Sequence, residues 1–400
     1  MSAALKGYLR SDGRKGIRNL TLVAYLVECA HHVSREIVYP FRANGCHLIG
    51  FPGCFPNPYA HRMMEALCTH PNVGAVLLVS LGCESFARRR LMETIASSGR
   101  PVEVLVIQKE GGTRSTVEKG RRWVAEQVEA LSRTERVPMG LDELVVGTIC
   151  GGSDATSGMT ANPAIGLAFD RLVDDGSACI FEETGELIGC EHLLARRSVT
   201  ESLAKEIVAS VEKARHYYEV LGHGSFASGN AEGQLTTQEE KSIGAYAKSG
   251  SRGIAGLIKP ADHPPRGGLF LLDVVPDGEV RFGFPNIVDN AEIAELIACG
   301  SHIILFATGR GSVVGSAISP VIKVCGNPET YARLSDDMDV NAGAVLTGEA
   351  TLSDVGDEIY RQTISVATGN ASRSEELGHQ EFILTYKSFD PIGPACLPTI

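Results

Sequence analysis

Short apolar runs alternate with longer amphipathic stretches along the first 135 residues of this chain. Strand–helix alternation of this kind predicts a parallel sheet with helices on both faces. We therefore expect an α/β fold built from Rossmann-like domains. The expected strands are Leu20–Val27, Cys46–Phe51, Ala75–Leu81 and Val102–Ile107, and the expected helices are His31–Phe41, Tyr59–Thr69, Glu84–Ser98 and Thr113–Arg133.

A chain of 400 residues is too long for one ordinary core, so we expect more than one domain. The charged segment 132–138 separates an N-terminal α/β domain, residues 1–135, from a C-terminal α/β region, residues 139–400. The polar stretch 222–240 is expected to be an irregular loop, and a loop of this length is more often functional than idle. The C-terminal region has expected strands ending at Cys150 and at Cys179–Glu182, Leu269–Val274 and Ile303–Ala307, and expected helices Ala164–Asp174 and Thr200–Leu221.

The charge balance argues against nucleic-acid binding. The chain has 37 Lys and Arg against 48 Asp and Glu, a net charge of −11, and it shows no basic stripe for a polyanion. The N-terminus lacks a signal-peptide apolar core, and no apolar run is long enough to span a bilayer. We therefore expect a cytoplasmic protein that does not bind membranes. In a reducing compartment its eleven cysteines are buried thiols or metal ligands.

Three cysteines follow expected strands directly: Cys54, Cys83 and Cys150. A single cysteine is more often a small buried apolar residue than a ligand. Three thiols at the carboxyl ends of parallel strands, each beside a glycine, instead favour a metal site, because ligands bind at that edge of such sheets. Glu84 adds a carboxylate to this candidate ligand set.

Two further residues are candidates for the general base. Glu183, in the segment FEETGELIGCEHL, follows an apolar strand and would emerge at the same edge. The alternative is a solvated acidic turn. Lys241 begins an expected helix after the polar stretch 222–240, and it is either a surface lysine, a base or a carboxylate anchor. A glutamate needs a raised pKa for this task, and a lysine needs a lowered one.

Arginines supply candidate clamps for a substrate carboxylate. Arg14 and Arg18 lie on a glycine-rich turn, and Arg310 directly follows a strand. A guanidinium group binds a carboxylate through two parallel hydrogen bonds, which suits this role.

The motifs DGRKGIRN, HPNVGAVLLVSLGCE, CGGSDATSGMTANPAIG, EETGELIGCE, LTTQEEKSIGAYAKSG, ATGRG and DMDVNAG follow one another in this order. In this series, from about residue 6 to residue 370, the chain resembles the altronate/galactarate dehydratase family. The resemblance implies elimination of water from a sugar acid to give a 2-keto-3-deoxy acid. It also implies iron as the activating metal, either as Fe²⁺ or in an iron–sulfur cluster. A related sulfolactate sulfo-lyase expels sulfite instead.

The resemblance also bears on partners and substrate. Single-chain members begin with a small SAF-type domain, so the resemblance implies a separate small SAF-type subunit and an oligomer. Gly50 stands where sugar-acid enzymes of the family carry a histidine, and Phe55 stands at the position of a glycine. The missing histidine argues against a sugar-acid substrate, and the bulkier phenylalanine indicates a smaller or less polar one.

These features together predict an active site on the glycine-rich turn that follows Cys150. Asp154 is expected to coordinate or orient a metal, and Ser153, Ser157, Asn162, Asn230, Thr236 and Thr237 are expected to bind the substrate. The predicted reaction is metal-dependent β-elimination from a small 2-hydroxy acid, with release of sulfite from sulfolactate as the alternative. An oxidoreductase would need a better nucleotide loop than Gly309, Gly311 and Gly315 provide. A non-catalytic sugar-acid binding protein would need no such cluster of thiols, carboxylates and lysine.

Overall fold

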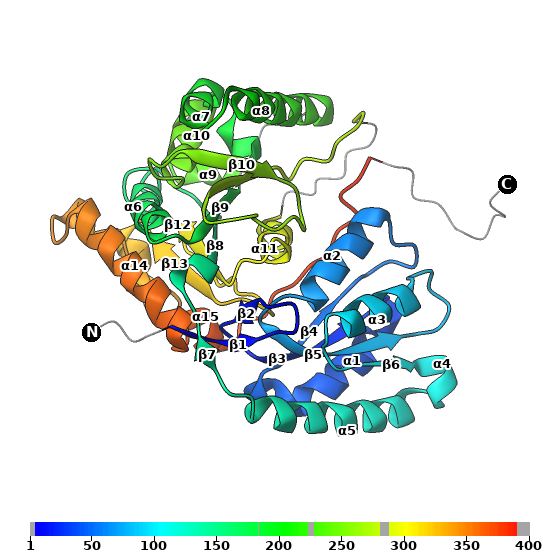
Figure 1. Cartoon of the computed structure of the whole chain (residues 1–400). Coiled ribbons are helices and arrows are strands. Elements are labelled where there is room, and N and C mark those ends of the chain that lie inside the picture. The colour runs from blue at the N-terminus through cyan, green and yellow to red at the C-terminus, as the bar shows by residue number, and fades with distance from the viewer. Residues whose placement is uncertain (1–4, 183, 223–227, 281–287, 390–400) are drawn as a thin grey trace.

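The computed structural model describes residues 5–182, 184–222, 228–280 and 288–389 (Figure 1). Two parallel sheets carry the architecture, and helices cover both faces of each, as the alternation of strands and helices predicted. Within the described ranges, no helix has both the length and the apolar character needed to cross a membrane.

The first half contains a four-stranded parallel sheet in the order β4-β3-β5-β6. Its strands read as nearly continuous apolar runs because both faces are buried. Helices α1 and α5 cover one face, and α2 and α3 cover the other. The elements are β3 Leu20–Tyr25, η1 Glu28–Ala30, α1 His31–Val38, η2 Tyr39–Asn44, β4 Cys46–Gly50, α2 Pro58–Cys68, β5 Val73–Ser80, α3 Arg88–Ser97, β6 Val102–Val106, α4 Ile107–Glu110 and α5 Thr113–Ser132.

The second half contains a seven-stranded parallel sheet in the order β10-β11-β9-β8-β12-β13-β14. Its strands are β8 Val145–Cys150, β9 Ala178–Glu182, β10 Ile254–Ile258, β11 Gly268–Leu272, β12 Ile303–Thr308, β13 Val321–Cys325 and β14 Val340–Asn341. Its helices are η3 Leu141–Glu143, α6 Ala161–Asp174, η4 Thr184–Leu187, α7 Glu191–Arg197, α8 Glu201–Leu221, α9 Ser228–Glu232, α10 Gln238–Ala247, α11 Asp289–Ala298, α12 Pro328–Arg333, α13 Ala344–Thr347, α14 Leu352–Thr368 and α15 Arg373–Leu377.

The strand order reverses direction at β8. From β8 the chain proceeds to β9 on one side, and it later crosses to β12 on the other side. In open α/β sheets, ligands bind in the crevice at the carboxyl ends of the strands where this reversal occurs. The turns after β8 and β12 therefore lie where a ligand is most expected to bind in this sheet.

A small antiparallel sheet joins the two halves. It consists of β1 Lys6–Leu9, β2 Lys15–Gly16 and β7 Val137–Pro138, in the order β2-β1-β7. Part of the predicted linker is thus a strand. Two-residue strands are too short to show a hydrophobic period, which is why the sequence did not reveal them.

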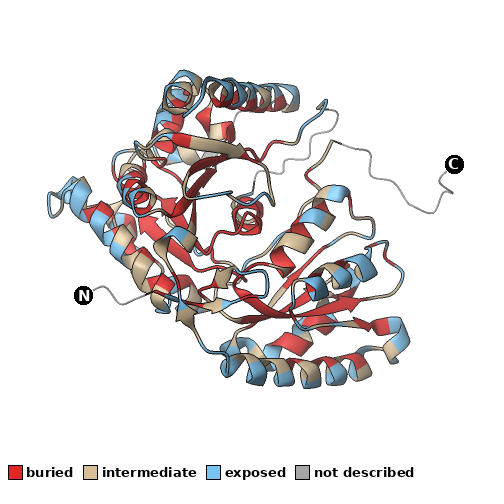
Figure 2. Ribbon diagram, in the orientation of Figure 1, coloured by how far each residue is buried: buried red, intermediate tan, exposed pale blue. Residues whose placement is uncertain are grey.

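The two halves share one hydrophobic core. Helix α2 of the first half packs against α11, which lies on one face of the seven-stranded sheet. Buried side chains on both sides of this contact include Met63, Leu67, Ile293 and Leu296. Figure 2 shows the buried residues running from one sheet through these helices to the other.

Two expected elements differ in detail. The helix expected from Glu84 begins at Arg88, because the Glu84 carboxylate instead accepts hydrogen bonds from the Ser80 hydroxyl and from the backbone N–H of Gly82 at 2.9 Å. The stretch 222–240, expected to be irregular, contains helix α9 and the start of α10. The residues 223–227 of that stretch lie outside the described ranges.

Acid is expected to destabilise the junction through His302. Its Nδ1 accepts the Val145 N–H at 3.0 Å, and its Nε2 lies 2.8 Å from the carbonyl oxygen of Lys15, so the ring is neutral. Burial lowers the pKa of His302 to about 4. A histidine in the unfolded chain has a pKa of about 6.5. The stabilisation that the neutral His302 ring gives the folded state is therefore complete above that pH and is lost as the pH falls from about 6.5 to about 4. The loss is at most about 3 kcal/mol.

Thermal melts at about pH 7 and pH 4.5 measure this effect. His302→Gln is the control, because its amide supplies one acceptor and one donor without titrating. The Tm of His302→Gln should fall less on acidification than the Tm of the unsubstituted protein. An equal loss in both would assign the acid sensitivity to other groups.

Candidate active site

The turn after β8 is held by backbone contacts to the end of β12. The Gly151 N–H donates to the Ala307 carbonyl at 3.0 Å, and the Arg310 N–H donates to the Gly152 carbonyl at 2.8 Å. Gly152 has a φ of +59°, and a Cβ on Gly151 would lie 2.1 Å from a carboxylate oxygen of Asp289. The two glycines therefore allow the turn to pass close to both β12 and α11.

Asp154 organises this turn from inside. One of its carboxylate oxygens accepts the backbone N–H of Thr156 at 2.9 Å and of Ser157 at 3.2 Å. The other accepts the Asn327 side-chain amide at 3.0 Å. A Cβ on Gly309 would lie 1.9 Å from the Asp154 carboxylate, so β12 also closes around it. In this structure Asp154 fixes the shape of the turn, as does the Ser157 hydroxyl, which accepts the Asp154 N–H at 3.1 Å.

Lys241 lies at the centre of a buried polar cluster. Its side chain is 5% exposed, and its ammonium group pairs with Glu186 at 2.9 Å. The same nitrogen donates to the Ser153 hydroxyl at 3.0 Å and to the Cys150 sulfur at 3.3 Å. The Ser153 hydroxyl also donates to the Cys150 sulfur at 3.1 Å, and Glu186 lies 3.5 Å from that sulfur. Three side chains thus meet around the Cys150 thiol.

The environment keeps Lys241 protonated. Burial disfavours its ammonium form, but Cys150 and Glu186 more than offset this effect, so the pKa of Lys241 is raised. We expected a general base with a lowered pKa, and this arrangement instead favours an ammonium donor.

A second buried lysine shares the cluster. Lys248 caps the C-terminal end of α10 and is hydrogen-bonded to Cys150. Burial lowers its pKa, although Cys150, Glu182 and Asp289 partly oppose this shift. Lys241 and Lys248 are seven residues apart, which places them on one face of the helix. That spacing is the sequence signal that would have identified Lys248.

A cavity of about 280 Å³ opens beside the cluster. Lys241, Ser153 and Asn162 supply polar groups to its lining. Asn162 also ties α6 to α10, because its side-chain amide donates to the Gly244 carbonyl at 3.0 Å. The remaining lining is mostly apolar and consists of Ala155, Gly158, Met159, Leu235, Ile243 and Gly244, together with Asp154, Ser157 and Glu240.

The end of the polar stretch 222–240 covers the turn. The Asn230 amide donates to the Ser153 carbonyl at 3.0 Å, so this predicted residue reaches the site. Thr236 and Thr237 serve the helix instead. The Thr237 hydroxyl accepts the N–H of Glu240 at 3.2 Å as the N-cap of α10, and the Thr236 N–H donates to the Glu240 carboxylate at 3.0 Å.

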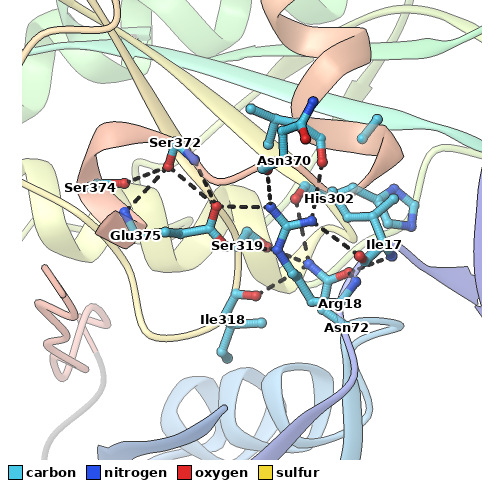
Figure 3. A network of polar contacts seen from close by, with 12 residues as sticks. Ile17, Arg18, Asn72, His302, Ile318, Ser319, Asn370, Ser372, Ser374 and Glu375 are labelled. Atoms are coloured by element: carbon cyan, nitrogen blue, oxygen red, sulfur yellow. Dashed lines mark hydrogen bonds and ion pairs between the residues drawn. The ribbon is translucent and has the colours of Figure 1, made fainter. Parts of the chain in front are cut away.

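Arg18 has a structural role in this arrangement (Figure 3). It pairs bidentately with Glu375 at 2.7 and 2.8 Å, and it donates to the carbonyl oxygens of Ile17, Val366 and Asn370. These contacts use all five guanidinium hydrogens. No donor remains for the substrate carboxylate that we expected Arg18 to bind.

Arg14 lies at the junction of the two halves. Its guanidinium group pairs with Asp12 at 2.7 Å and contacts the Thr69 carbonyl at 2.8 Å and His263 at 2.9 Å. None of these partners lines the cavity beside Lys241. Arg310 is not part of that lining either, but its backbone N–H donates to Gly152, which places it beside the Cys150 turn.

The predicted metal ligands do not form one set. Cys54 and Cys83 are exposed on neighbouring loops of the first half, where the Ser85 N–H donates to the Cys54 carbonyl at 2.9 Å. Cys150 is buried in the second half against the Lys241 ammonium, which would repel a cation. Among the residues that the structure describes, no three Cys, His, Asp or Glu side chains are placed to hold one ion. The donor set therefore does not fit a single iron site at Cys150.

Two glutamates of the EETGELIGCE segment bear on the site. Glu183, the alternative base, lies outside the described residues. Glu186, which the sequence analysis did not select, is the residue of the EETGELIGCE segment that contacts Lys241. Helix η4 directs it there, and the acidic segment alone did not indicate which carboxylate would point inward.

Comparisons with known proteins identify the family. A family model described as D-galactarate/altronate dehydratase, C-terminal, matches residues 141–389. A second model, described as D-galactarate dehydratase/altronate hydrolase, second domain, matches residues 7–132. The residues between the two matches, 133–140, include strand β7.

The relatives have lyase names. The (2R)-sulfolactate sulfo-lyase subunit beta of Chromohalobacter salexigens is 32% identical over 95% of this chain and 96% of its own length. The galactarate dehydratase of Escherichia coli K12 is 33% identical over 77% of this chain, which spans only 59% of that relative. The altronate dehydratase of Bacillus subtilis 168 is 28% identical over 95% of this chain and 77% of its own length. The chain is a lyase that cleaves a carbon–oxygen or a carbon–sulfur bond, and it belongs to the D-galactarate/altronate dehydratase family.

Proposed function

We propose that this chain catalyses β-elimination from a small 2-hydroxy acid at the Cys150 turn. The observation that carries the proposal is the buried Lys241 ammonium, which lines the cavity and is held by Glu186, Ser153 and Cys150. A fixed and buried positive charge stabilises negative charge that develops on a substrate.

The roles follow from the charges. Elimination removes a proton from one carbon and breaks the bond from its neighbour to the leaving group. Lys241, held protonated, stabilises the carboxylate as the carbon loses its proton, or donates a proton to a leaving hydroxide. Glu183 remains our predicted base. Asp154 and Ser157 keep the turn in shape, so the site needs little reorganisation during the reaction.

The leaving group is either water or sulfite. The resemblance in the sequence favours a sugar-acid dehydratase that yields a 2-keto-3-deoxy acid. The match to a sulfo-lyase subunit over almost its whole length supports sulfite release from sulfolactate as a second candidate. An assay of purified protein on galactarate, altronate, glycerate and 3-sulfolactate decides between them, with 2-keto acid and sulfite measured separately. Absence of a 2-keto acid from every substrate, in the presence of the partner subunit described below, would contradict the proposal.

Iron binding remains a prediction, and no step above is routed through a metal. Protein purified without oxygen should contain iron, and acid-labile sulfide would distinguish a cluster from a single ion. The triple Cys→Ser variant at Cys54, Cys83 and Cys150 tests the predicted ligands. Undiminished iron in that variant would exclude them.

We also propose a small partner subunit of the SAF type. The sulfo-lyase relative is named as a subunit beta, so a partner subunit is implied. We expect a cytoplasmic oligomer whose large chain alone is weakly active, and whose activity rises when the small subunit is added. Full turnover by the isolated 400-residue chain would count against this proposal.

A further inference from the structure

Arg310, at the end of β12, is held by helix α9. One of its terminal nitrogens donates to the Gly229 carbonyl, and the other pairs with a carboxylate oxygen of Glu232 at 3.1 Å. The Arg310 side chain is 40% exposed and that of Glu232 is 72% exposed. The contact is therefore a solvated ion pair, and the Arg310 backbone binds the Cys150 turn at Gly152.

Helix α9 rests on the Cys150 turn. The Asn230 amide donates to the Ser153 carbonyl at 3.0 Å, and the Gly233 carbonyl accepts the Ala155 N–H at 2.9 Å. The Ser153 hydroxyl in turn contacts Lys241. Helix α9 thus connects Glu232 to the turn that carries Cys150 and Ser153.

An exposed ion pair is weak, typically worth about 0.2–1 kcal/mol. A substrate carboxylate that binds the Arg310 guanidinium through two parallel hydrogen bonds is held more strongly than Glu232, because its two oxygens match the two donors. The Glu232 contact uses one terminal nitrogen only. A bidentate carboxylate would therefore displace it.

We propose that Glu232 competes with the substrate for Arg310. In the empty site Glu232 pairs with Arg310, and when the substrate binds, its carboxylate replaces Glu232 and releases α9. Glu232 thus sets the affinity for the substrate. This inference rests on the function proposed above. It assigns the substrate carboxylate to Arg310 and the leaving-group end to Lys241.

The decisive variant is Glu232→Gln, which removes the competing charge and keeps the side-chain shape. We expect its KM to fall by about 1.4- to 5-fold, which is the value of an exposed ion pair converted to a ratio. Arg310→Gln should raise KM by roughly ten- to a hundred-fold, because a charged hydrogen-bond donor is lost. In the Arg310→Gln background, Glu232→Gln should have no further effect on KM.

Glu239→Gln is the matched control, because Glu239 is an exposed glutamate on the first turn of α10. It removes the same charge close to the site, and its KM should equal that of the unsubstituted protein. A KM that stays constant or rises in Glu232→Gln would overturn the proposal, since a merely structural Glu232 predicts that result.

A second measurement does not need turnover. Hydrogen–deuterium exchange of peptides covering residues 228–237 should be faster in Glu232→Gln and Arg310→Gln than in Glu239→Gln. If no hydroxy acid is turned over by the unsubstituted protein with its partner, the proposed function fails while exchange still tests the contact. Unchanged exchange in Glu232→Gln would show that the ion pair does not hold α9 and would overturn the proposal.

Discussion

Replacing Lys241 with methionine is expected to lower turnover by about a hundred- to ten-thousand-fold at saturating substrate. The methionine fills much of the lysine volume but removes the ammonium group that contacts Glu186, Ser153 and Cys150. Both the positive charge at the leaving-group end of the substrate and the proton donor are lost. The measurement is 2-keto acid formation, with sulfite measured in parallel.

Lys205→Met provides the control for Lys241→Met. Lys205 is 76% exposed on α8 and pairs only with Glu201 among the contacts described. Its turnover should equal that of the unsubstituted protein, and circular dichroism should show that both variants are folded. Turnover of folded Lys241→Met within about threefold of the unsubstituted rate would place the reaction elsewhere.

Replacing Arg18 with methionine is expected to destabilise the protein by at least about 3 kcal/mol. The change removes the Arg18 hydrogen bonds from the partly buried Glu375 carboxylate and from the carbonyl oxygens of Ile17, Val366 and Asn370. The urea midpoint should fall, whereas KM of the folded protein should stay constant. Arg18 would prove to be a substrate clamp, as the sequence first suggested, if stability were retained and KM rose.

Arg89→Met is the matched control for this stability measurement. The Arg89 side chain is 88% exposed and pairs with Glu93 one helical turn away, so its loss should cost well under about 1 kcal/mol. Comparing the stability lost in the two variants distinguishes a guanidinium that binds several backbone carbonyls from one that makes a single solvated ion pair.

The sequence predicted the parallel sheets because most of their strands are buried and therefore read as nearly continuous apolar runs. It did not predict β1, β2 and β7, because these strands are short and β7 pairs with a segment more distant in the chain. Strand β10 was missed for a related reason, since alanine and glycine interrupt its apolar run at Ala255 and Gly256. Sequence patterns thus identified the interior of each half better than the junction between them.

The candidate site shows the same division. The Cys150 turn was recognisable because its polar residues are contiguous and follow a strand. The partners of those residues come from elsewhere in the chain. Asn327 binds Asp154 from the end of β13, and Glu186 reaches Lys241 from η4. Contacts with Cys150 and Glu186 keep Lys241 protonated despite its burial, and the sequence does not show which distant residues will meet.

The contact between α2 and α11 restricts how a substrate enters. Opening the two halves like a hinge would expose the shared apolar side chains to water, at about 25 cal/mol for each Å² uncovered. Because Met63, Leu67, Ile293 and Leu296 lie in that contact, the halves should move as one rigid body. Access must then depend on a few residues at the rim, and the rate of substrate entry should follow the local motion of α9.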